Sequence, residues 1–229
     1  MSSRFLEWVS SVGADQSEAE RSTGYSIAPG VVTNNIDVLG EGRVQVRIPT
    51  LEAFEPMARV CALGAGSGRG FAWVPQIDDE VLVAFAQNDE RDVYVLGGLW
   101  STTTRPPLTL PTDFLVKRVI KTGVKDSPLG HEVEFDDLEQ SITIKSSTEQ
   151  KIKIDPTTIE IETTGGTLSL KMDLTTQTIS ITAPLKIELK AAQISLQGTA
   201  SVDIKGGKIN LQAASELSVL GARVKINSP

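Results

Sequence analysis

The second half of the chain repeats a short pattern in which two apolar residues flank one polar residue. In a β-strand, alternate side chains lie on the same face, so each unit predicts a strand about three residues long with two inward side chains. A fixed repeat of this kind indicates a solenoid-like needle, which we place at residues 132–229. The units are Val133/Phe135, Ile142/Ile144, Ile152/Ile154, Ile159/Ile161, Leu168/Leu170, Ile179/Ile181, Ile187/Leu189, Ile194/Leu196, Val202/Ile204, Ile209/Leu211, Leu217/Val219 and Val224/Ile226.

The spacing of the last units indicates how the needle is built. From Ile187 onward, the units follow one another at alternating steps of seven and eight residues. A single-chain β-helix needs about twenty residues for each coil, because the coil must run around an apolar core. The shorter step carries one chain across one face of a triangular prism, and two further copies then complete each layer. We therefore expect an intertwined homotrimer, with a needle about 50–60 Å long if its strands lie 4.8 Å apart.

Residues 25–112 show a different pattern of short strands separated by turns. Strands are predicted at Arg43–Ile48, at Glu80–Phe85 and at Val93–Trp100. Several short strands at regular spacing, with turn residues between them, are typical of a small closed barrel. Prolines then interrupt the pattern, and we assign residues 113–131 to a connector between barrel and needle.

The first residues of the chain differ from the rest. Residues 1–24 begin with an apolar cluster and continue with serine, alanine and acidic residues, which predicts a short amphipathic helix that frays into a linker. The segment is either a cap packed on the barrel or a docking segment for a partner protein. The residues of the cluster are Phe5, Leu6, Trp8 and Val9.

Composition narrows the range of functions. Of the 229 residues, 40% are hydrophobic and 22% charged, with a net charge of −7. Nucleic-acid binding leaves a basic footprint, which is lacking here, and we interpret Trp73, Tyr94 and Trp100 as core residues rather than as a stacking platform. The single cysteine, Cys61, has apolar neighbours and is expected to be buried. We find no signal-peptide pattern and no apolar run of about 20 residues, so we expect synthesis in the cytosol.

Candidate catalytic residues are few. Three acidic clusters lie in or beside predicted turns: Asp78–Glu80, Asp89–Glu90 and Asp136–Asp137. We interpret their carboxylates as solvent-exposed turn residues and not as catalytic groups. The single histidine, His131, has no nucleophile motif or metal-ligand spacing around it, and we interpret it as structural or at the surface. The glycine-rich stretch Leu63–Gly70 lacks the lysine of a phosphate-binding loop. We therefore predict a protein that is not an enzyme, with no cofactor and no metal site.

Three segments together resemble a known family. Gly42–Pro49, Trp73–Phe85 and Asp92–Trp100 closely resemble the OB-fold domain of phage baseplate assembly protein V and of the VgrG spikes of type VI secretion. Gly130–Asp137 resembles the entry to the β-helix of that family. One departure is Asp78, which stands where the family usually has glycine. The resemblance implies an all-β chain with an N-terminal OB-fold barrel followed by an intertwined trimeric β-helix.

The resemblance also implies a function. Proteins of this family form the central spike of contractile tails and injection machines, in which sheath contraction drives the spike through the target envelope. The chain has no room for the hub domain of larger members, so we expect a separate hub protein bound to Phe5, Leu6, Trp8 and Val9. We expect assembly into a phage tail baseplate or injection system and transient contact with a target membrane.

The end of the needle is predicted to bind another protein. Some phage spikes end in a His-x-His iron site, which a chain with one histidine cannot form. In the family, a blunt end is capped by a conical PAAR-repeat protein, and we expect one here on Val224, Ile226, Asn227, Ser228 and Pro229. An alternative function is a β-helical carbohydrate-binding or depolymerising tail fibre, and a third is a filament-forming β-solenoid. The repeats lack aromatic residues after Phe135, which is unfavourable for carbohydrate binding.

Overall fold

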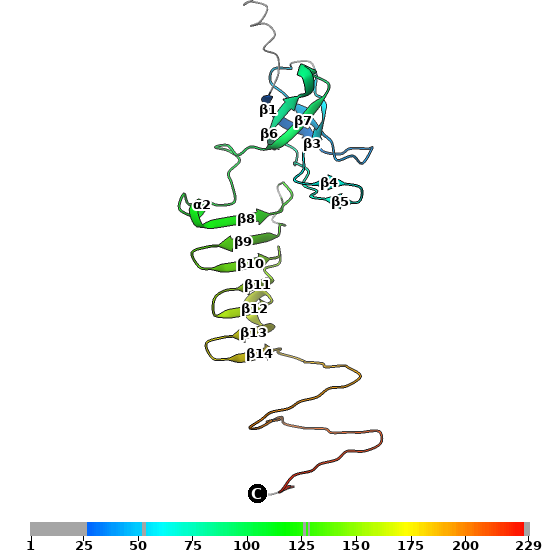
Figure 1. Cartoon of the computed structure of the whole chain (residues 1–229), viewed down its shortest axis with the longest axis vertical. Helices are drawn as coiled ribbons and strands as arrows, with labels where there is room; N and C mark the ends of the chain where they lie inside the picture. Colours follow the sequence, from blue (N-terminus) through cyan, green and yellow to red (C-terminus); the bar gives the residue numbers. More distant parts are fainter. Residues whose placement is uncertain (1–26, 52–53, 126, 128, 227–229) are drawn as a thin grey trace, which may run out of the picture. The chain divides into compact units, whose positions relative to one another are not determined.

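The computed structural model describes residues 27–51, 54–125, 127 and 129–226. The regular secondary structure of the described part is almost entirely β-strand (Figure 1), with one four-residue α-helix, α2, at Asp113–Val116. The chain divides into two compact units at Pro184 and Leu185. The first unit contains a closed barrel and a seven-stranded sheet, and the second contains no strand among its described residues.

Five strands close into the barrel in the order β1-β2-β3-β7-β6. Neighbouring strands are antiparallel except for β3 and β7, which are parallel. The predicted small closed barrel and the all-β character are thereby confirmed. The barrel strands are β1 (Ile27–Asn34), β2 (Val44–Arg47), β3 (Met57–Val60), β6 (Glu80–Phe85) and β7 (Val93–Gly98), and the 3₁₀ turn η1 (Ala86–Asn88) links the last two.

The barrel encloses an aliphatic core. Every second residue of β2 and of β6 points inward, so Val44, Val46, Val81 and Val83 are fully buried. Gly30 of β1 faces this core without a side chain, and a Cβ atom there would lie 2.5 Å from Cγ1 of Val46. The remaining buried hydrophobic residues are Ala28, Val32, Ile48, Leu51, Ala58, Phe85, Val93 and Val95.

Two expectations about the barrel are wrong. Trp73 and Trp100 are not core residues, since 44% and 67% of their surfaces are exposed. Both lie outside the strands, because β7 ends at Gly98 and residues 71–76 form none. Cys61 is also exposed. It follows the last residue of β3, at the base of a small projecting hairpin made of β4 (Ala65–Gly66) and β5 (Arg69–Gly70).

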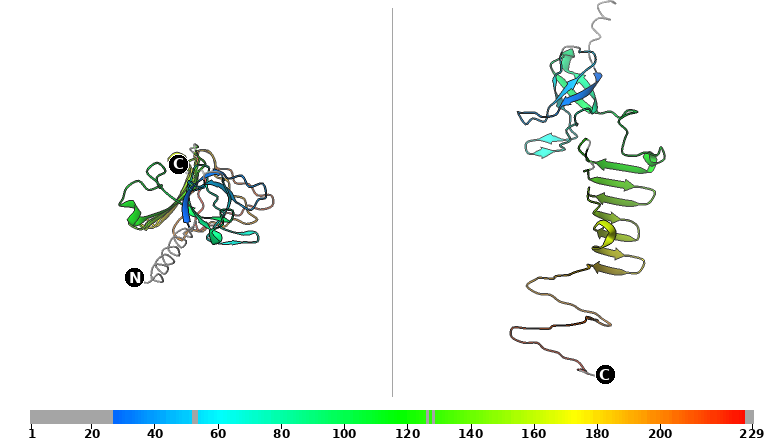
Figure 2. Two further views of the ribbon diagram at one scale, coloured as in Figure 1. Left: turned by 90° about the horizontal axis from the view of Figure 1, so that it is seen from above. Right: turned by 180° about the vertical axis from the view of Figure 1, so that it is seen from behind.

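The seven-stranded sheet is an antiparallel meander in which each strand pairs with the next along the chain (Figure 2). It begins at Lys117, inside the stretch that we expected to be a connector. The strands are β8 (Lys117–Lys121), β9 (Glu132–Asp136), β10 (Ser141–Lys145), β11 (Lys151–Ile154), β12 (Thr158–Glu162), β13 (Ser169–Asp173) and β14 (Thr178–Thr182), with the 3₁₀ turn η2 (Thr164–Gly166) between β12 and β13.

This meander corrects the predicted winding of the needle. Between residues 132 and 182, consecutive strands are hydrogen-bonded within one chain, so intertwining is wrong for this stretch. The turns explain this pairing, because each is long enough for the chain to reverse and pair with the preceding strand in antiparallel. The predicted unit Leu168/Leu170 is also shifted, because β13 starts at Ser169 and its apolar pair is Leu170/Met172.

The second unit, described for residues 185–226, runs as extended chain without strands (Figure 1). No backbone hydrogen bond joins any of these residues to another described residue. An extended chain that is unpaired in this way is a row of free strand donors and acceptors. No helix in the described part of the chain has the length and apolar character to cross a membrane.

Candidate assembly interface

The register of the seven-stranded sheet sorts its side chains into two faces. Directly paired residues share a face, and the pairing aligns the apolar units of successive strands into two columns across the sheet. One face is therefore apolar, and the other carries the intervening polar residues. The first column is Ile120, Val133, Ile144, Ile152, Ile161, Leu170 and Ile181, and the second is Phe135, Ile142, Ile154, Ile159, Met172 and Ile179.

The apolar face is open in the single chain. Eleven of its thirteen large side chains are exposed, from 38% at Ile152 to 69% at Ile179, and the other two, Val133 and Leu170, are half-buried. The polar residues opposite them, such as Thr143 and Lys153, are no more exposed than the isoleucines that they alternate with. Contiguous apolar patches larger than a few hundred Å² are rare on monomeric proteins and mark interaction surfaces. We name this surface the apolar face and regard it as the candidate interface.

The opposite face carries ion pairs across neighbouring strands. Lys117 of β8 lies 3.2 Å from Asp136 of β9, and Lys121 lies 2.8 Å from Glu132. Lys151 of β11 lies 2.5 Å from Glu162 of β12. Hydrogen bonding to Glu162 raises the pKa of Lys151. Such exposed pairs contribute only about 0–1 kcal/mol each to stability. Their charged side chains nevertheless identify this face of the sheet as the one that contacts solvent.

Aspartates fix alternate turns of the meander along one edge of the sheet. The Asp155 carboxylate accepts hydrogen bonds from the hydroxyl of Thr158 at 2.7 Å and from the backbone N–H groups of Thr157 and Thr158 at 2.9 and 2.8 Å. These bonds, led by the Thr158 hydroxyl, lower the pKa of Asp155. Asp136 and Asp173 accept backbone N–H groups in the next turns of this edge, which likewise lower their pKa values. The sequence predicted a turn at Asp136–Asp137 but not at Asp155 or Asp173, although aspartate is a common turn residue because its side chain accepts hydrogen bonds from the backbone that follows.

The second unit extends the same apolar pattern without any partner. Ile187, Leu189 and the later pairs are all exposed, and Val224 and Ile226 of the predicted tip site expose 49% and 80% of their surfaces. The remaining predicted tip residues, Asn227, Ser228 and Pro229, lie outside the described residues. The same holds for the predicted hub-docking residues Phe5, Leu6, Trp8 and Val9. The structure thus places two of the nine predicted contact residues, both on exposed chain.

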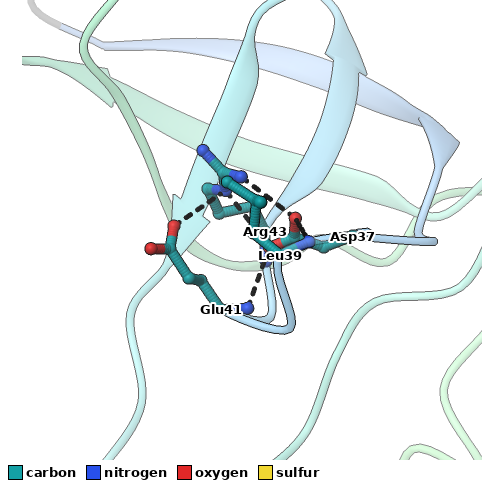
Figure 3. A network of polar contacts seen from close by, with 4 residues as sticks. All are labelled: Asp37, Leu39, Glu41 and Arg43. Atoms are coloured by element: carbon teal, nitrogen blue, oxygen red, sulfur yellow. Dashed lines mark hydrogen bonds and ion pairs between the residues drawn. The ribbon is translucent and has the colours of Figure 1, made fainter.

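The barrel carries one further exposed apolar element, the loop between β1 and β2 (Figure 3). The carboxylate of Asp37 accepts hydrogen bonds from the backbone N–H groups of Leu39 and Glu41 at 3.1 Å each and from the Arg43 guanidinium at 3.0 Å. The bond with the Arg43 side chain is the main reason that the pKa of Asp37 is lowered. This network holds the loop in one conformation and leaves Val38 92% exposed at its tip.

The candidate chemical groups are dispersed. Within the described ranges, no cluster of three histidine, cysteine, aspartate or glutamate side chains could hold a metal ion. His131 is exposed, and its backbone closes the loop between β8 and β9 on Thr122. Asp78 adopts a φ of +69°, the left-handed region that favours glycine and that aspartate tolerates better than most residues.

Comparison with known proteins assigns the barrel. Residues 28–100 match the family model described as the type VI secretion system/phage-baseplate injector OB domain. The barrel thus resembles the OB domain of these injectors. An alignment 102 positions long, which covers 42% of this chain, shows 31% identity to the actin cross-linking toxin VgrG1 of Vibrio cholerae serotype O1. The match covers 9% of that toxin, so the chain corresponds to a small part of it.

These matches confirm the resemblance to VgrG-like baseplate and spike proteins. The matched residues span the five barrel strands, apart from the first residue of β1. Asp78 lies within the matched residues and takes the left-handed conformation at the position where the resemblance implies glycine. Aspartate tolerates this conformation better than most residues, so the turn before β6 forms without glycine.

Proposed function

We propose that three copies of this chain form the central spike of a contractile tail or injection machine. The observation that carries the proposal is the apolar face, two columns of large side chains that the single chain leaves largely open. Burying one large aliphatic side chain stabilises by about 1.5–3 kcal/mol, so a sheet with this face in water gains strongly from association. The similarity of the barrel to injector OB domains supports the view that the assembled trimer is a spike.

In the proposed trimer, each chain supplies one whole face of a triangular prism. The apolar faces of three sheets meet on the axis, and the ion-paired faces point outward. Six strand intervals of about 4.8 Å make this part about 29 Å long. In the second unit, residues 185–226 of the three copies complete one another's strands. The steps of seven and eight residues support a three-sided arrangement, since each step crosses one face.

The mechanical role follows from the bonding. When the apolar faces pack together, water is excluded from the trimer axis. Hydrogen bonds then join neighbouring strands along the whole sheet, and such a prism has no lateral edge and no hinge. The spike would transmit the thrust of a contracting sheath and contact the target membrane transiently. We propose that the protein is not an enzyme and does not bind nucleic acid.

Two protein partners belong to this proposal. A separate hub would hold the trimer of OB domains, with the segment around Phe5 and Trp8 as its docking site. A PAAR-repeat tip protein would cover the last layer, where Val224 and Ile226 are exposed. The protein would be made in the bacterial cytoplasm and assembled into a tail baseplate or injection system. The exposed side chains of the last layer support a cap, because a free apolar end associates non-specifically.

The oligomeric state tests the proposal directly. We expect light scattering of the full chain to give the mass of a trimer and a band that resists SDS until the sample is boiled. A monomer at micromolar concentration would contradict the proposed spike. A dimer would contradict the prism and favour two sheets packed face to face.

A further inference from the structure

Exposed leucines lie in turns along both edges of the seven-stranded sheet. The edge beside α2 contains the turns that follow β9, β11 and β13, and the other edge contains the loops that precede these strands (Figure 1). Turns usually favour glycine, proline, asparagine, aspartate and serine. On the first edge, however, Leu138 and Leu174 are 74% and 71% exposed. On the second edge, Leu129 and Leu168 are 62% and 46% exposed. We name these four residues the turn leucines.

The turn leucines flank two strands of the sheet. Leu168 immediately precedes β13, and Leu174 immediately follows it. In a similar way, Leu129 lies shortly before β9 and Leu138 shortly after it. Since β9 and β13 are four strand intervals apart in the sheet, these two strands are separated by about 19 Å. Each of them has a leucine near both of its ends.

The strand midway between them, β11, is flanked differently. The turn before it, Ser146–Gln150, contains only serine, threonine, glutamate and glutamine, and the Ser146 hydroxyl accepts a hydrogen bond from the backbone N–H of Gln150 at 3.1 Å. The turn after it consists of Asp155, Pro156 and Thr157. Neither turn contains leucine, isoleucine or valine. The two edges therefore change character together, with leucine at both ends of β9 and β13 and at neither end of β11.

Hydrogen bonds fix the backbone that carries the turn leucines. The N–H of Leu174 donates to the carbonyl of Thr157 at 2.8 Å, which joins two successive turns of one edge. On the other edge, the N–H of Leu168 donates to the Thr163 hydroxyl at 3.2 Å, and its carbonyl accepts the Thr163 N–H at 3.0 Å. The Asp136 turn described above holds Leu138. Exposed side chains on ordered turns can bind a partner at a small entropic cost.

A three-sided prism brings the two kinds of edge together. If the three-fold axis runs along the stacking direction of the strands, a given strand lies at the same height in all three copies. The end of β13 in one copy then faces the start of β13 in the next copy, and the same holds for β9 and β11. Leucine meets leucine at two of these heights, and a turn without leucine meets another at the third. A second copy of this chain therefore supplies a matching edge at every height.

We propose that the turn leucines form the seam between neighbouring copies, with Leu174 packed against Leu168 of the next copy and Leu138 against Leu129. The inference rests on the proposed trimer and names the residues that join its sheets along their edges. The apolar faces are buried on the axis of the prism, whereas the turn leucines close its corners near both ends of the sheet.

Cross-linking tests this seam. In a Cys61→Ser background, Leu168→Cys and Leu174→Cys are combined in the full chain and treated with a short bis-maleimide. Within one chain these positions lie at opposite ends of β13, about 20 Å apart and too far for the reagent. The negative control combines Leu168→Cys with Leu138→Cys, which flank different strands. The positive control combines Thr143→Cys with Lys153→Cys, a pair that the sheet aligns within one chain.

We expect the Leu168–Leu174 pair to give a covalent trimer on denaturing gels, because each copy is joined to the next. The negative control should stay at monomer size with free thiols, and the positive control should stay at monomer size with its thiols consumed. A trimer by light scattering whose Leu168–Leu174 pair stays unlinked would overturn the seam, and so would equal linking of the negative control. A monomer of the original protein would instead overturn the proposed trimer itself.

The contribution of the seam to assembly has its own test. Leu174→Ser should lower the association constant of the trimer on the order of a thousandfold, because three leucine contacts per trimer are lost. Leu174→Met should retain most of the affinity, since it keeps an apolar side chain of similar volume. Circular dichroism of the sheet should be the same for both variants, because Leu174 is exposed in the single chain. Equal association constants for the two variants would contradict the packing of Leu174 in the seam.

Discussion

Ile144 offers the sharpest test of the apolar face. It lies in the first column between Val133 and Ile152, in the middle of the sheet. The Ile144→Asp substitution places a carboxylate on that face, while Thr143→Asp places the same group one residue earlier on the opposite face. Both substitutions lie in the same strand and replace a β-branched residue by aspartate. A difference in stability between the two variants therefore reports on the face that carries the carboxylate.

The expected size of the effect follows from exposure. Ile144 leaves 46% of its surface exposed in the single chain. Since full burial of a large aliphatic stabilises by about 1.5–3 kcal/mol, covering that fraction contributes about 0.7–1.4 kcal/mol per chain and about 2–4 kcal/mol per trimer. Each carboxylate taken out of water costs several kcal/mol more. The total loss is on the order of 10 kcal/mol per trimer, which is about seven decades in the association constant.

Light scattering and thermal unfolding measure the outcome. We expect Ile144→Asp to be monomeric at micromolar concentration, or to form a trimer that dissociates far below the melting temperature of the original protein. Thr143→Asp should remain trimeric, because its carboxylate lies among Glu134 and Lys153 on the solvated face. Trimers of Ile144→Asp that melt at the same temperature as those of Thr143→Asp would refute the assignment of the apolar face.

Three further changes test the barrel and the turns. Gly30→Ala should destabilise the barrel by about 1–3 kcal/mol in chemical unfolding, because its methyl group would overlap Val46. The turn aspartates have lowered pKa values, so their stabilisation is complete above the unfolded pKa of about 3.9 and is lost as the pH falls through the folded values; circular dichroism should show the sheet weakening below about pH 4. Asp155→Ala should lower the melting temperature at pH 7 and flatten this acid dependence. Asp37→Ala should make the loop after β1 more sensitive to limited proteolysis, with the barrel core retained.

Strand positions could be predicted wherever one face is buried or ordered by a repeat. Val44 and Val46 show the simple case, since alternation with polar residues predicts both the strand and its inward face, and both side chains are buried. The two apolar columns could be predicted for the same reason. In both cases the alternation of apolar and polar residues predicts the strand and its apolar face. This alternation can be recognised without knowing which strands pair.

Connectivity could not be predicted in the same way. The repeat before and after Pro184 has the same apolar pattern, yet the chain makes hairpins on one side and runs unpaired on the other. The difference lies in the turns, where hydroxyl and carboxylate acceptors such as Ser146 and Asp155 close the loop. The prediction that Trp73 lies in the core was wrong for another reason. An aromatic residue in an apolar run can lie on a loop, and Trp73 lies outside the strands with 44% of its surface exposed.

The two parts of the proposed needle place different demands on folding. Strands of the meander pair with neighbours close in sequence, so their contacts carry a small loop-closure cost and can form in a single chain. Residues 185–226 have no such contacts, and strands about three residues long cannot hold together without a template. In the proposed trimer, the apolar faces already hold the three copies together, which brings the three segments of residues 185–226 close enough to pair. A spike that begins as a single-chain sheet and continues as shared strands therefore solves a nucleation problem that an intertwined needle alone would face.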